Sequence, residues 1–299
     1  MNAMSDPAAL VAAAPYGRVE TVSPLVRRVL ARNPSPFTYT GTGTYIIGPK
    51  VAGGTVAIVD PGPDDPEHIA ALIDAVAGET VSHIIVTHTH RDHSPAAPAV
   101  KAATGAIVVG CARLVLDDAG PRADAGFDRT YDPDAVLADG DSVSGPGWTL
   151  TALHTPGHTS NHLCFALAEE RALFSGDHVM GWSTTVVAPP DGDMAAYIAS
   201  LRLLLDRDDA VYYPTHGAPI HDPQRLVRGL IIHRKQRETQ ILKSLADGPK
   251  SVPAIVAGMY ASVDPRLHPA AGLSVTAHLI DLRTRGVVSG GTDLWKMAV

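Results

Sequence analysis

Short apolar runs separated by polar loops occupy the first two-thirds of the chain. They are rich in Val, Ile and Leu, which is typical of buried strands. The predicted strands are Thr44–Ile47, Val56–Val59, His83–Thr87, Ala106–Val109, Thr149–Leu153, Leu163–Leu167 and Val211–Tyr213. Helical patterns lie between them, at Pro66–Ala77, Pro95–Thr104 and Asp193–Leu205. Because strands and helices interleave, the pattern favours an α/β or mixed α+β class.

The pattern changes after His216, where helical periodicity replaces the short strands. Pro223–Leu245 is predicted to be one long helix, with an apolar face and a polar face that carries the basic cluster 234–237. Two shorter helices follow at Val252–Met259 and Leu273–Arg285, and short apolar runs at 286–288 and 294–297 complete the chain. Three helices and a β-hairpin in this order are typical of a winged helix. We therefore predict a catalytic domain over residues 1–222 and a winged-helix-like domain over residues 223–299.

Charge is unevenly distributed between these two parts. The chain of 299 residues has a net charge of −7, and its length is sufficient for one large domain and a small appendage. From Gly217 to the end, 11 Lys and Arg stand against 6 Asp and Glu (net +5), whereas the remainder has 13 against 25 (net −12). The excess indicates either an anionic partner for the C-terminal part or a solvated helical surface.

Cysteine usage and hydropathy bear on the compartment. Cys111 and Cys164 are the two cysteines, so a disulfide scaffold is excluded and a reducing compartment is the simplest interpretation. Residues 1–20 have no basic start followed by an apolar block, so they do not resemble a secretion signal. No apolar run reaches the roughly 18 residues that a membrane span needs. We expect a cytoplasmic protein with no membrane partner.

The strongest chemical signal follows the predicted strand at 83–87. Four potential metal ligands lie within six residues: His88, His90, Asp92 and His93. In an extended chain, side chains two residues apart point the same way, so His88 and His90 can hold one ion. A turn before the next helix would direct Asp92 and His93 towards a second ion. Imidazole and carboxylate are suitable zinc ligands.

Three further candidates each lie at the end of a β-rich run and are flanked by Gly or Pro. They are His154 in His154-Thr155-Pro156-Gly157-His158, Asp177 in Gly176-Asp177-His178, and His216 in Thr215-His216-Gly217. Loops at the ends of a rigid sheet commonly carry functional groups. His158, His162, His178 and His221 lie near these motifs and are candidates for supporting roles. Asp60, in Val59-Asp60-Pro61-Gly62, either orients a ligand histidine or caps a turn.

These residues resemble the metallo-β-lactamase superfamily, whose hallmark is H-x-H-x-D-H followed by a downstream His, Asp and His. The resemblance implies a four-layer αββα sandwich with the metals at one edge. It assigns His88, His90 and His154 to one zinc ion, and Asp92, His93 and His216 to the other. Asp177 would bridge both ions, and Asp92 and Asp177 would be the residues most important for catalysis.

Nearly the whole chain resembles the β-lactamase-like protein 2 family within this superfamily. The matching segments include Gly41–Tyr45, Thr87–Ser94, Gly181–Val187 and the C-terminal winged helix with Trp295. The resemblance implies a binuclear zinc-dependent hydrolase, with Mn²⁺ or Fe²⁺ as substitute metals, acting on single-stranded RNA. A water between the two ions would lose a proton near neutral pH and become the nucleophile. One departure is Pro95-Ala96-Ala97 after Ser94, where many members have two glycines, which leaves the substrate in doubt.

The ligands alone leave three functions open, because two-metal chemistry serves phosphodiesters, thioesters, lactones and β-lactams alike. The first is hydrolysis of RNA phosphodiesters, for which the Arg234, Lys235 and Arg237 cluster is the predicted phosphate contact. The second is hydrolysis of a small thioester or lactone, in the manner of glyoxalase II. The third is a non-catalytic nucleic-acid-binding protein that uses its winged helix. A homodimer is compatible with each of them.

Overall fold

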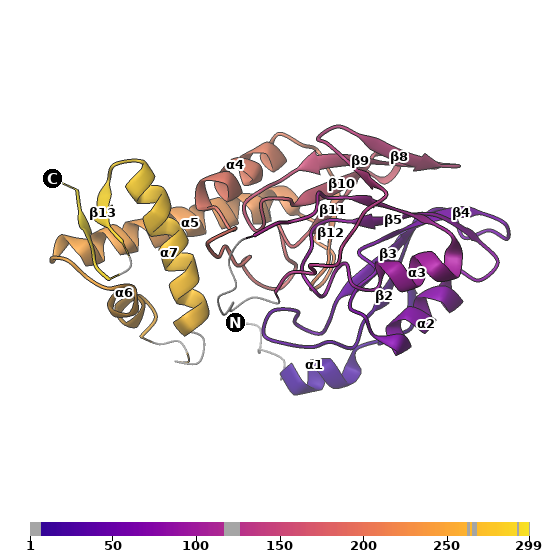
Figure 1. The fold of residues 1–299 in the computed structure, drawn as a ribbon, viewed down its shortest axis with the longest axis horizontal. Helices are drawn as coiled ribbons and strands as arrows, with labels where there is room; N and C mark the ends of the chain where they lie inside the picture. The colour runs from indigo at the N-terminus through magenta and orange to yellow at the C-terminus, as the bar shows by residue number, and fades with distance from the viewer. Residues whose placement is uncertain (1–6, 117–125, 262–263, 265–267, 292, 299) are drawn as a thin grey trace.

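The computed structural model describes residues 7–116, 126–261, 264, 268–291 and 293–298. Two β-sheets face each other, and helices cover both outer faces (Figure 1). This is the four-layer αββα arrangement that was predicted from the sequence. A smaller helical domain with a β-hairpin extends from one end of the sandwich.

The first sheet contains seven strands in sequence order. They are β1 (Val19–Thr21), β2 (Val26–Leu30), β3 (Gly43–Ile47), β4 (Thr55–Val59), β5 (Thr80–Val86), β6 (Ile107–Gly110) and β7 (Ala135–Val136). The strands from β1 to β4 pair antiparallel, and those from β4 to β7 pair parallel. The helices α2 (Pro66–Ala75) and α3 (Ala97–Thr104) make two of the parallel crossovers, β4 to β5 and β5 to β6. Asp65 caps α2 by accepting a hydrogen bond from the backbone N–H of Glu67.

The second sheet contains five strands in the order β12-β11-β10-β9-β8. They are β8 (Ser142–Gly145), β9 (Trp148–His154), β10 (Leu163–Leu167), β11 (Ala172–Gly176) and β12 (Val211–Pro214), with the short 3₁₀ helix η1 (Ala168–Glu170) after β10. The helix α4 (Met194–Leu205) connects the parallel strands β11 and β12. Its N-terminus is capped by Asp193, which accepts from the backbone N–H of Ala196 at 2.8 Å.

Aromatic side chains hold the two sheets together. Tyr45 on β3 is buried and donates its hydroxyl to the carbonyl of Pro214 on β12 at 2.7 Å. Its ring meets Phe174 edge to face, with centroids 5.2 Å apart. Trp148 on β9 donates to the carbonyl of Thr55 on β4 at 2.9 Å. These contacts fix the separation of the sheets and hence the relative positions of the loops at their edge.

The C-terminal part consists of α5 (Pro223–Ala246), α6 (Val252–Met259), α7 (His268–Thr284), β13 (Val288–Gly290) and β14 (Trp295–Met297). This order of elements is that of the predicted winged helix. The first half of α5 contributes Val227 and Leu230 to a core shared with α4. Its second half contributes Ile241 and Leu245 to a core formed with α6, α7 and Trp295. One helix therefore belongs to both hydrophobic cores, and the exact domain boundary at residue 222 stays a prediction.

The basic cluster on α5 differs from its predicted role as an exposed phosphate contact. Arg234 is buried at 3% exposure, and its guanidinium donates to the carbonyl of Thr185 and covers the ring of Tyr197. Arg237 lies over the ring of Tyr260, 4.7 Å from its centroid. The cluster thus includes a residue that packs against the sandwich. Among the described helices, none is long and apolar enough to cross a membrane.

Candidate metal centre

The loops that follow the strands of both sheets converge at one edge of the sandwich. The segment 87–94 follows β5, Asp177 follows β11, and His216 follows β12. The turn between β9 and β10 contributes His158. Two groups of His and Asp side chains lie there, and in each group the potential ligand atoms are all within 4.8 Å of one another.

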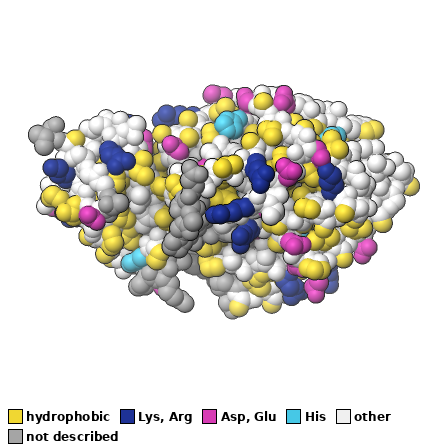
Figure 2. Space-filling view, in the orientation of Figure 1, with side chains coloured by type: hydrophobic (Ala, Val, Ile, Leu, Met, Phe, Trp, Pro, Cys, Tyr) yellow, Lys and Arg dark blue, Asp and Glu magenta, His cyan; other side chains and the backbone are white. Residues whose placement is uncertain are grey.

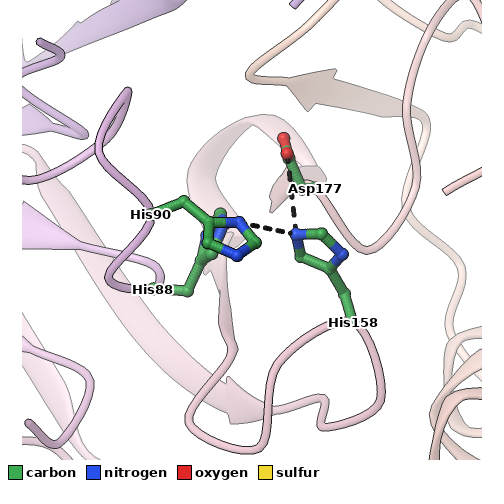
Figure 3. A group of neighbouring side chains, drawn as sticks. All are labelled: His88, His90, His158 and Asp177. Carbon is green, nitrogen blue, oxygen red and sulfur yellow. Dashed lines mark hydrogen bonds and ion pairs between the residues drawn. The ribbon is translucent and has the colours of Figure 1, made fainter. Parts of the chain in front are cut away.

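The first group is His88, His90, His158 and Asp177 (Figure 3). The Nε2 atoms of His88 and His158 lie 3.0 and 3.1 Å from Nδ1 of His90. Asp177 Oδ2 lies 3.8 Å from Nε2 of His158. His158 approaches from a separate loop, opposite the pair that follows β5. The four side chains are buried and enclose a common point.

The second group is Asp92, His93 and His216. His216 Nε2 lies 3.0 Å from Asp92 Oδ2 and 3.4 Å from Asp177 Oδ1. His93 Nε2 lies 3.6 Å from Asp92 Oδ2 and 3.5 Å from Asp177 Oδ2. The carboxylate of Asp177 therefore faces ligand atoms of both groups, as the predicted bridging position requires.

The hydrogen bonds of the ring nitrogens fit metal binding. His158 Nδ1 donates to the carbonyl of Val186 at 2.6 Å, and His216 Nδ1 donates to the carbonyl of Gly41 at 3.1 Å. A ring that donates through Nδ1 presents an unprotonated Nε2 when it is neutral. These Nε2 lone pairs point into the site, where they can bind a cation. The donor set of imidazoles and carboxylates is one that zinc accepts.

Asp60 supports this arrangement from beneath the site. Its Oδ2 accepts from His93 Nδ1 at 2.8 Å, from the hydroxyl of Thr87 at 2.8 Å and from that of Thr215 at 3.1 Å. Thr87 in turn accepts from Nδ1 of His88. One buried carboxylate thus orients histidines of both groups, which is the first of the two roles considered for it.

The electrostatic environments of the two groups differ. Burial and the neighbouring histidines hold the pKa of His88 well below its usual value, and they lower the pKa of His158 to about 4. For His216, burial acts downward, but Asp177 and Asp92 outweigh it and raise the pKa to about 10. The carboxylates likewise raise the pKa of His93 well above its usual value, against the effect of burial.

The structure corrects the predicted position of His154, which it does not bring into either group. Strand β9 continues to His154, and the pairing of this residue with Leu163 directs its side chain to the exposed surface. Its Nε2 lies 3.1 Å from the carbonyl of Ser160. The turn at Gly157, where φ is +136° and a Cβ would lie 2.3 Å from Tyr197, directs His158 inward instead. A His directly after a Pro-Gly turn was the sequence signal for this position.

Two of the other candidate histidines lie behind the metal-binding side chains. His162 is buried, accepts a hydrogen bond from the backbone N–H of Asp177 at 3.2 Å and pairs with the hydroxyl of Thr155 at 2.9 Å. His178 is also buried and lies against the ring of Tyr197. His221 is exposed on the loop before α5. His162 therefore positions Asp177 through the backbone, whereas His221 is outside both groups.

The ligand side chains open into a small pocket. It is lined by Phe37, His90, Asp92, His158, Asp177, Met180, Val186 and His216. Five of these residues belong to the two ligand groups, and the remaining three are apolar. The described wall of the pocket therefore offers metal ligands and apolar surface, and its lining includes neither Lys nor Arg.

Comparison with known proteins agrees with the fold. Residues 251–295 match the family described as "Beta-lactamase associated winged helix domain". A beta-lactamase domain protein from Burkholderia ambifaria superposes with a TM-score of 0.77 at 22% identity, covering 95% of this chain and 94% of that one. A metallo-beta-lactamase family protein from Thermus thermophilus gives 0.72 at 22% identity, covering 93% and 100%. At this level of identity, the likeness establishes the fold.

Comparison of sequences finds relatives with a higher identity than these two solved structures. A lactamase-like protein of Pestalotiopsis microspora is 33% identical over 265 residues, 84% of this chain and 73% of that protein. An atrochrysone carboxyl ACP thioesterase of a Cryptosporiopsis species is 33% identical over 234 residues, 77% and 66% of the two chains. A beta-lactamase-like protein 2 homolog of Caenorhabditis elegans is 34% identical over 232 residues, 77% and 74%. Residues 41–216, more than half of the chain, match the family described as "Metallo-beta-lactamase superfamily", and the chain therefore belongs to this superfamily of hydrolases.

Proposed function

We propose that this protein is a metal-dependent hydrolase of thioesters, with two zinc ions as the metals and Mn²⁺ or Fe²⁺ as substitutes. The two ligand groups would hold one ion each, with His158 in the place that the sequence assigned to His154. Divalent ions bound there would supply Lewis acidity and lower the pKa of water towards neutrality. Among the esters open to this chemistry, the observation that favours thioesters is the composition of the pocket wall.

The described wall of the metal pocket holds no titratable side chain besides those of the ligand groups. A phosphodiester or alkyl ester leaves as an alkoxide, whose conjugate acid has a pKa of about 15, close to that of water. Such a leaving group benefits from a positioned general acid. A thiol has a pKa of about 8.5 and leaves as a thiolate without one. The absence of a further acid from the described pocket lining is therefore compatible with thioester hydrolysis, whereas RNA cleavage would depend on the metal ions themselves to stabilise the leaving alkoxide.

The apolar residues of the pocket have a complementary part. Phe37, Met180 and Val186 border the ligand groups and exclude bulk water from them. A lower local dielectric strengthens the interaction of a polarised carbonyl with nearby positive charge. Asp60 holds the ring of His93, and His162 holds the backbone of Asp177. These ligand groups therefore keep their orientation while the carbonyl of the substrate becomes tetrahedral. The chain thus supplies a site for a neutral carbonyl group in which three apolar side chains border the metal ligands.

The relatives lend independent support to the thioester assignment. One relative that is 33% identical is named as a thioesterase of an acyl-carrier-protein substrate, and others carry the same name. The β-lactamase-like protein 2 homolog carries no substrate in its name. RNA hydrolysis stays a prediction, based on the resemblance given above and on the positive C-terminal charge.

The distribution of that charge gives RNA little added support. Figure 2 shows Lys and Arg side chains over both domains on this face, interspersed with acidic ones. Arg285, for example, is paired with Glu238 and with Asp281 at 2.9 Å. A phosphate track instead needs a stripe of unneutralised cations. Nucleic-acid binding by the winged-helix domain is therefore the weaker of the two proposals.

The experiment that tests the proposal is an activity screen of protein reconstituted with zinc or manganese. The substrates are an acetyl thioester of N-acetylcysteamine, a lactone, a β-lactam and a single-stranded RNA of mixed sequence. We expect metal-dependent release of free thiol, detected with a thiol reagent, and loss of this activity on chelation. Cleavage of RNA at low salt without thioester turnover would overturn the assignment.

A further inference from the structure

A large apolar cleft lies next to the metal pocket. Its volume is about 830 Å³, which is within the range of small-molecule binding sites. Three segments build it: the helix α1 (Pro7–Ala13), the loop at 34–40 before β3, and the segment 181–182 with Ala218. Its lining residues are Ala8, Leu10, Val11, Pro34, Ser35, Pro36, Tyr39, Thr40, Gly181, Trp182 and Ala218.

Two of these segments also form the rim of the metal pocket. Phe37, within the first loop, and Met180, directly before the second segment, both line the metal pocket. The backbone N–H of Gly181 donates to the carbonyl of His216 at 2.9 Å. At the end of the loop 34–40, the carbonyl of Gly41 accepts a hydrogen bond from Nδ1 of His216. His216 is thus tied to both walls of the cleft, so the cleft and the metal pocket are neighbouring parts of one site.

The cleft is preformed rather than a gap between loose loops. Asn33 accepts from the backbone N–H of Thr42 at 2.9 Å, and its own carbonyl accepts from Thr38, which closes the loop on itself. The ring of Tyr39 stacks on that of Trp182, with centroids 4.9 Å apart and planes inclined by 15°. The two walls are therefore in contact through an aromatic pair.

The wall chemistry defines the occupant. None of the lining residues that the structure describes is charged. The hydroxyl of Ser35 is already engaged by the backbone N–H groups of Phe37 and Thr38. A phosphate or a polar carrier arm would find few partners on such walls, whereas an apolar group gains free energy from leaving water.

We propose that this cleft binds the apolar acyl group of the thioester substrate and so places its carbonyl at the metal pocket. The proposal rests on the proposed thioesterase function and adds the substrate class, a thioester of a long alkyl or an aryl carboxylic acid. The thiol part then leaves towards solvent. Because the cleft wall is anchored on His216, filling the cleft and positioning the carbonyl are coupled.

The experiment compares acyl groups on one thiol. Metal-loaded protein is assayed with acetyl, hexanoyl, decanoyl and naphthoyl thioesters of N-acetylcysteamine. We expect kcat/KM to rise roughly fourfold with each methylene that the cleft buries, until the cleft is full. The naphthoyl arm reports whether the aromatic pair favours aryl over alkyl groups.

Variants locate the effect. Trp182→Ala removes half of the stacked pair, and Ala218→Phe occupies the cleft from an exposed position. Both should lower kcat/KM for the decanoyl thioester at least about tenfold more than for the acetyl thioester. The matched control is Ile232→Ala, which removes an exposed apolar side chain that lies on α5 and outside the cleft. It should leave kcat/KM unchanged for both the acetyl and the decanoyl thioester. Equal losses on acetyl and decanoyl substrates, or no loss in either variant, would show that the cleft does not bind the acyl group.

A binding measurement separates this proposal from the function on which it rests. A non-hydrolysable decanoyl thioether analogue should change the tryptophan fluorescence of the wild type but much less that of Trp182→Phe. If thioesters are hydrolysed and the analogue gives no signal from Trp182, the acyl assignment is wrong and the thioesterase stands. If no thioester is hydrolysed, the function fails, and the acyl assignment fails with it.

Discussion

The two ligand groups at the edge of the sandwich share Asp177 but prepare their nitrogens for a metal in opposite ways. In the first group, burial together with repulsion from neighbouring histidines lowers the pKa of His88 and His158 and keeps these two rings neutral. In the second, His93 and His216 lie between carboxylates that raise the pKa of both rings. The first group therefore presents free lone pairs near neutral pH, whereas the second holds protons that a metal must displace.

This difference shows how a short chain segment can serve two sites. His88 and His90 extend from the end of β5 into the histidine-rich group. Asp92 and His93 follow after the turn and meet His216 from the second sheet. Asp177 is the one described residue whose carboxylate lies within 4 Å of ring nitrogens in both groups. Changing it should therefore affect both sites together.

The largest effect is expected for Asp177→Ala. The variant should lose turnover by at least about 10³-fold, roughly 4 kcal/mol of transition-state stabilisation, because both ions lose a ligand. Metal content, measured by elemental analysis, should fall below the two ions per chain expected for the wild type. The far-ultraviolet circular dichroism should be unchanged, since Asp177 lies outside the hydrophobic cores.

Asp208→Ala is the matched control, because this carboxylate is 94% exposed and lies before β12, whose other end leads to His216. It should retain full activity and two ions. A wild-type rate in Asp177→Ala would exclude the bridging role, and Asp92→Asn then becomes the next carboxylate to examine.

The next largest effect distinguishes His158 from His154. His158→Ala should reduce metal affinity at the histidine-rich group and activity by about 10²-fold, whereas His154→Ala should change both by less than about twofold. Titration with Co²⁺, followed by visible absorption, reports occupancy without turnover. Should His154→Ala lose the metal and His158→Ala keep it, the family-based assignment of His154 would be right and the geometry described above wrong.

This pair also shows what the sequence could predict. The strands before His88, Asp177 and His216 are apolar runs with clear ends, so the positions of these ligands could be inferred from sequence spacing. The turn from His154 to His158 depends on how Gly157 packs against Tyr197, a contact between distant segments. The spacing of the ligands contains no information about that contact, and the Pro156-Gly157 turn directly before His158 was a local sequence signal for the second histidine.

The strands of the fold were also predicted from apolar runs, and a strand that depends on contacts between distant segments was missed. The central strands β3, β4, β5 and β10 each contain a buried apolar run, and all were predicted. Strand β2 was not, because Arg27 and Arg28 interrupt its pattern. Arg27 is buried, and its guanidinium pairs with Glu79 at 2.8 Å and donates to the carbonyl of Ala75. These partners come together only in the tertiary structure. In the sequence, the two arginines therefore give a buried strand the pattern of an exposed segment.

The third prediction is that the metal affinities of the two ligand groups depend differently on pH. In the metal-free protein, carboxylates raise the pKa of His216 to about 10 and that of His93 well above its usual value, so metal binding at the second group should release protons from both rings at neutral pH. Its metal affinity should then rise more than about tenfold per pH unit between pH 7 and 9. Affinity at the first group should change little over this range, since His88 and His158 are already neutral.

Calorimetric titration in buffers of different ionisation enthalpy measures the number of protons released. The raised pKa of His216 also stabilises the metal-free fold. This contribution is fully present below the unfolded pKa of about 6.5 and is lost as the pH rises through about 10. The melting temperature of the metal-free protein should therefore fall over this range. Proton release that is equal for both ions would remove the distinction between the groups.

The smallest effect is expected at the junction between the domains, where the first group depends on α5. Arg234 donates to the carbonyl of Thr185, and the hydroxyl of Thr185 donates to the carbonyl of Asp177 at 2.8 Å. The next residue, Val186, holds the ring of His158. Arg234→Met should therefore loosen the histidine-rich group and lower kcat about tenfold, in the range typical of residues that orient metal ligands.

Arg237→Met is the matched control for this prediction, because Arg237 stacks on Tyr260 and bonds Gln240 away from the site. It should keep the wild-type kcat, although both variants lose one cation from α5. The Co²⁺ spectrum tests the mechanism: Arg234→Met should weaken the binding of the ion at His158 and leave the ion at His216 unchanged. If both ions are weakened equally, Arg234 acts by stabilising the domain junction as a whole. If neither is weakened while RNA affinity falls, Arg234 contributes to nucleic-acid binding despite its burial, and the charge of the C-terminal part regains its predicted role.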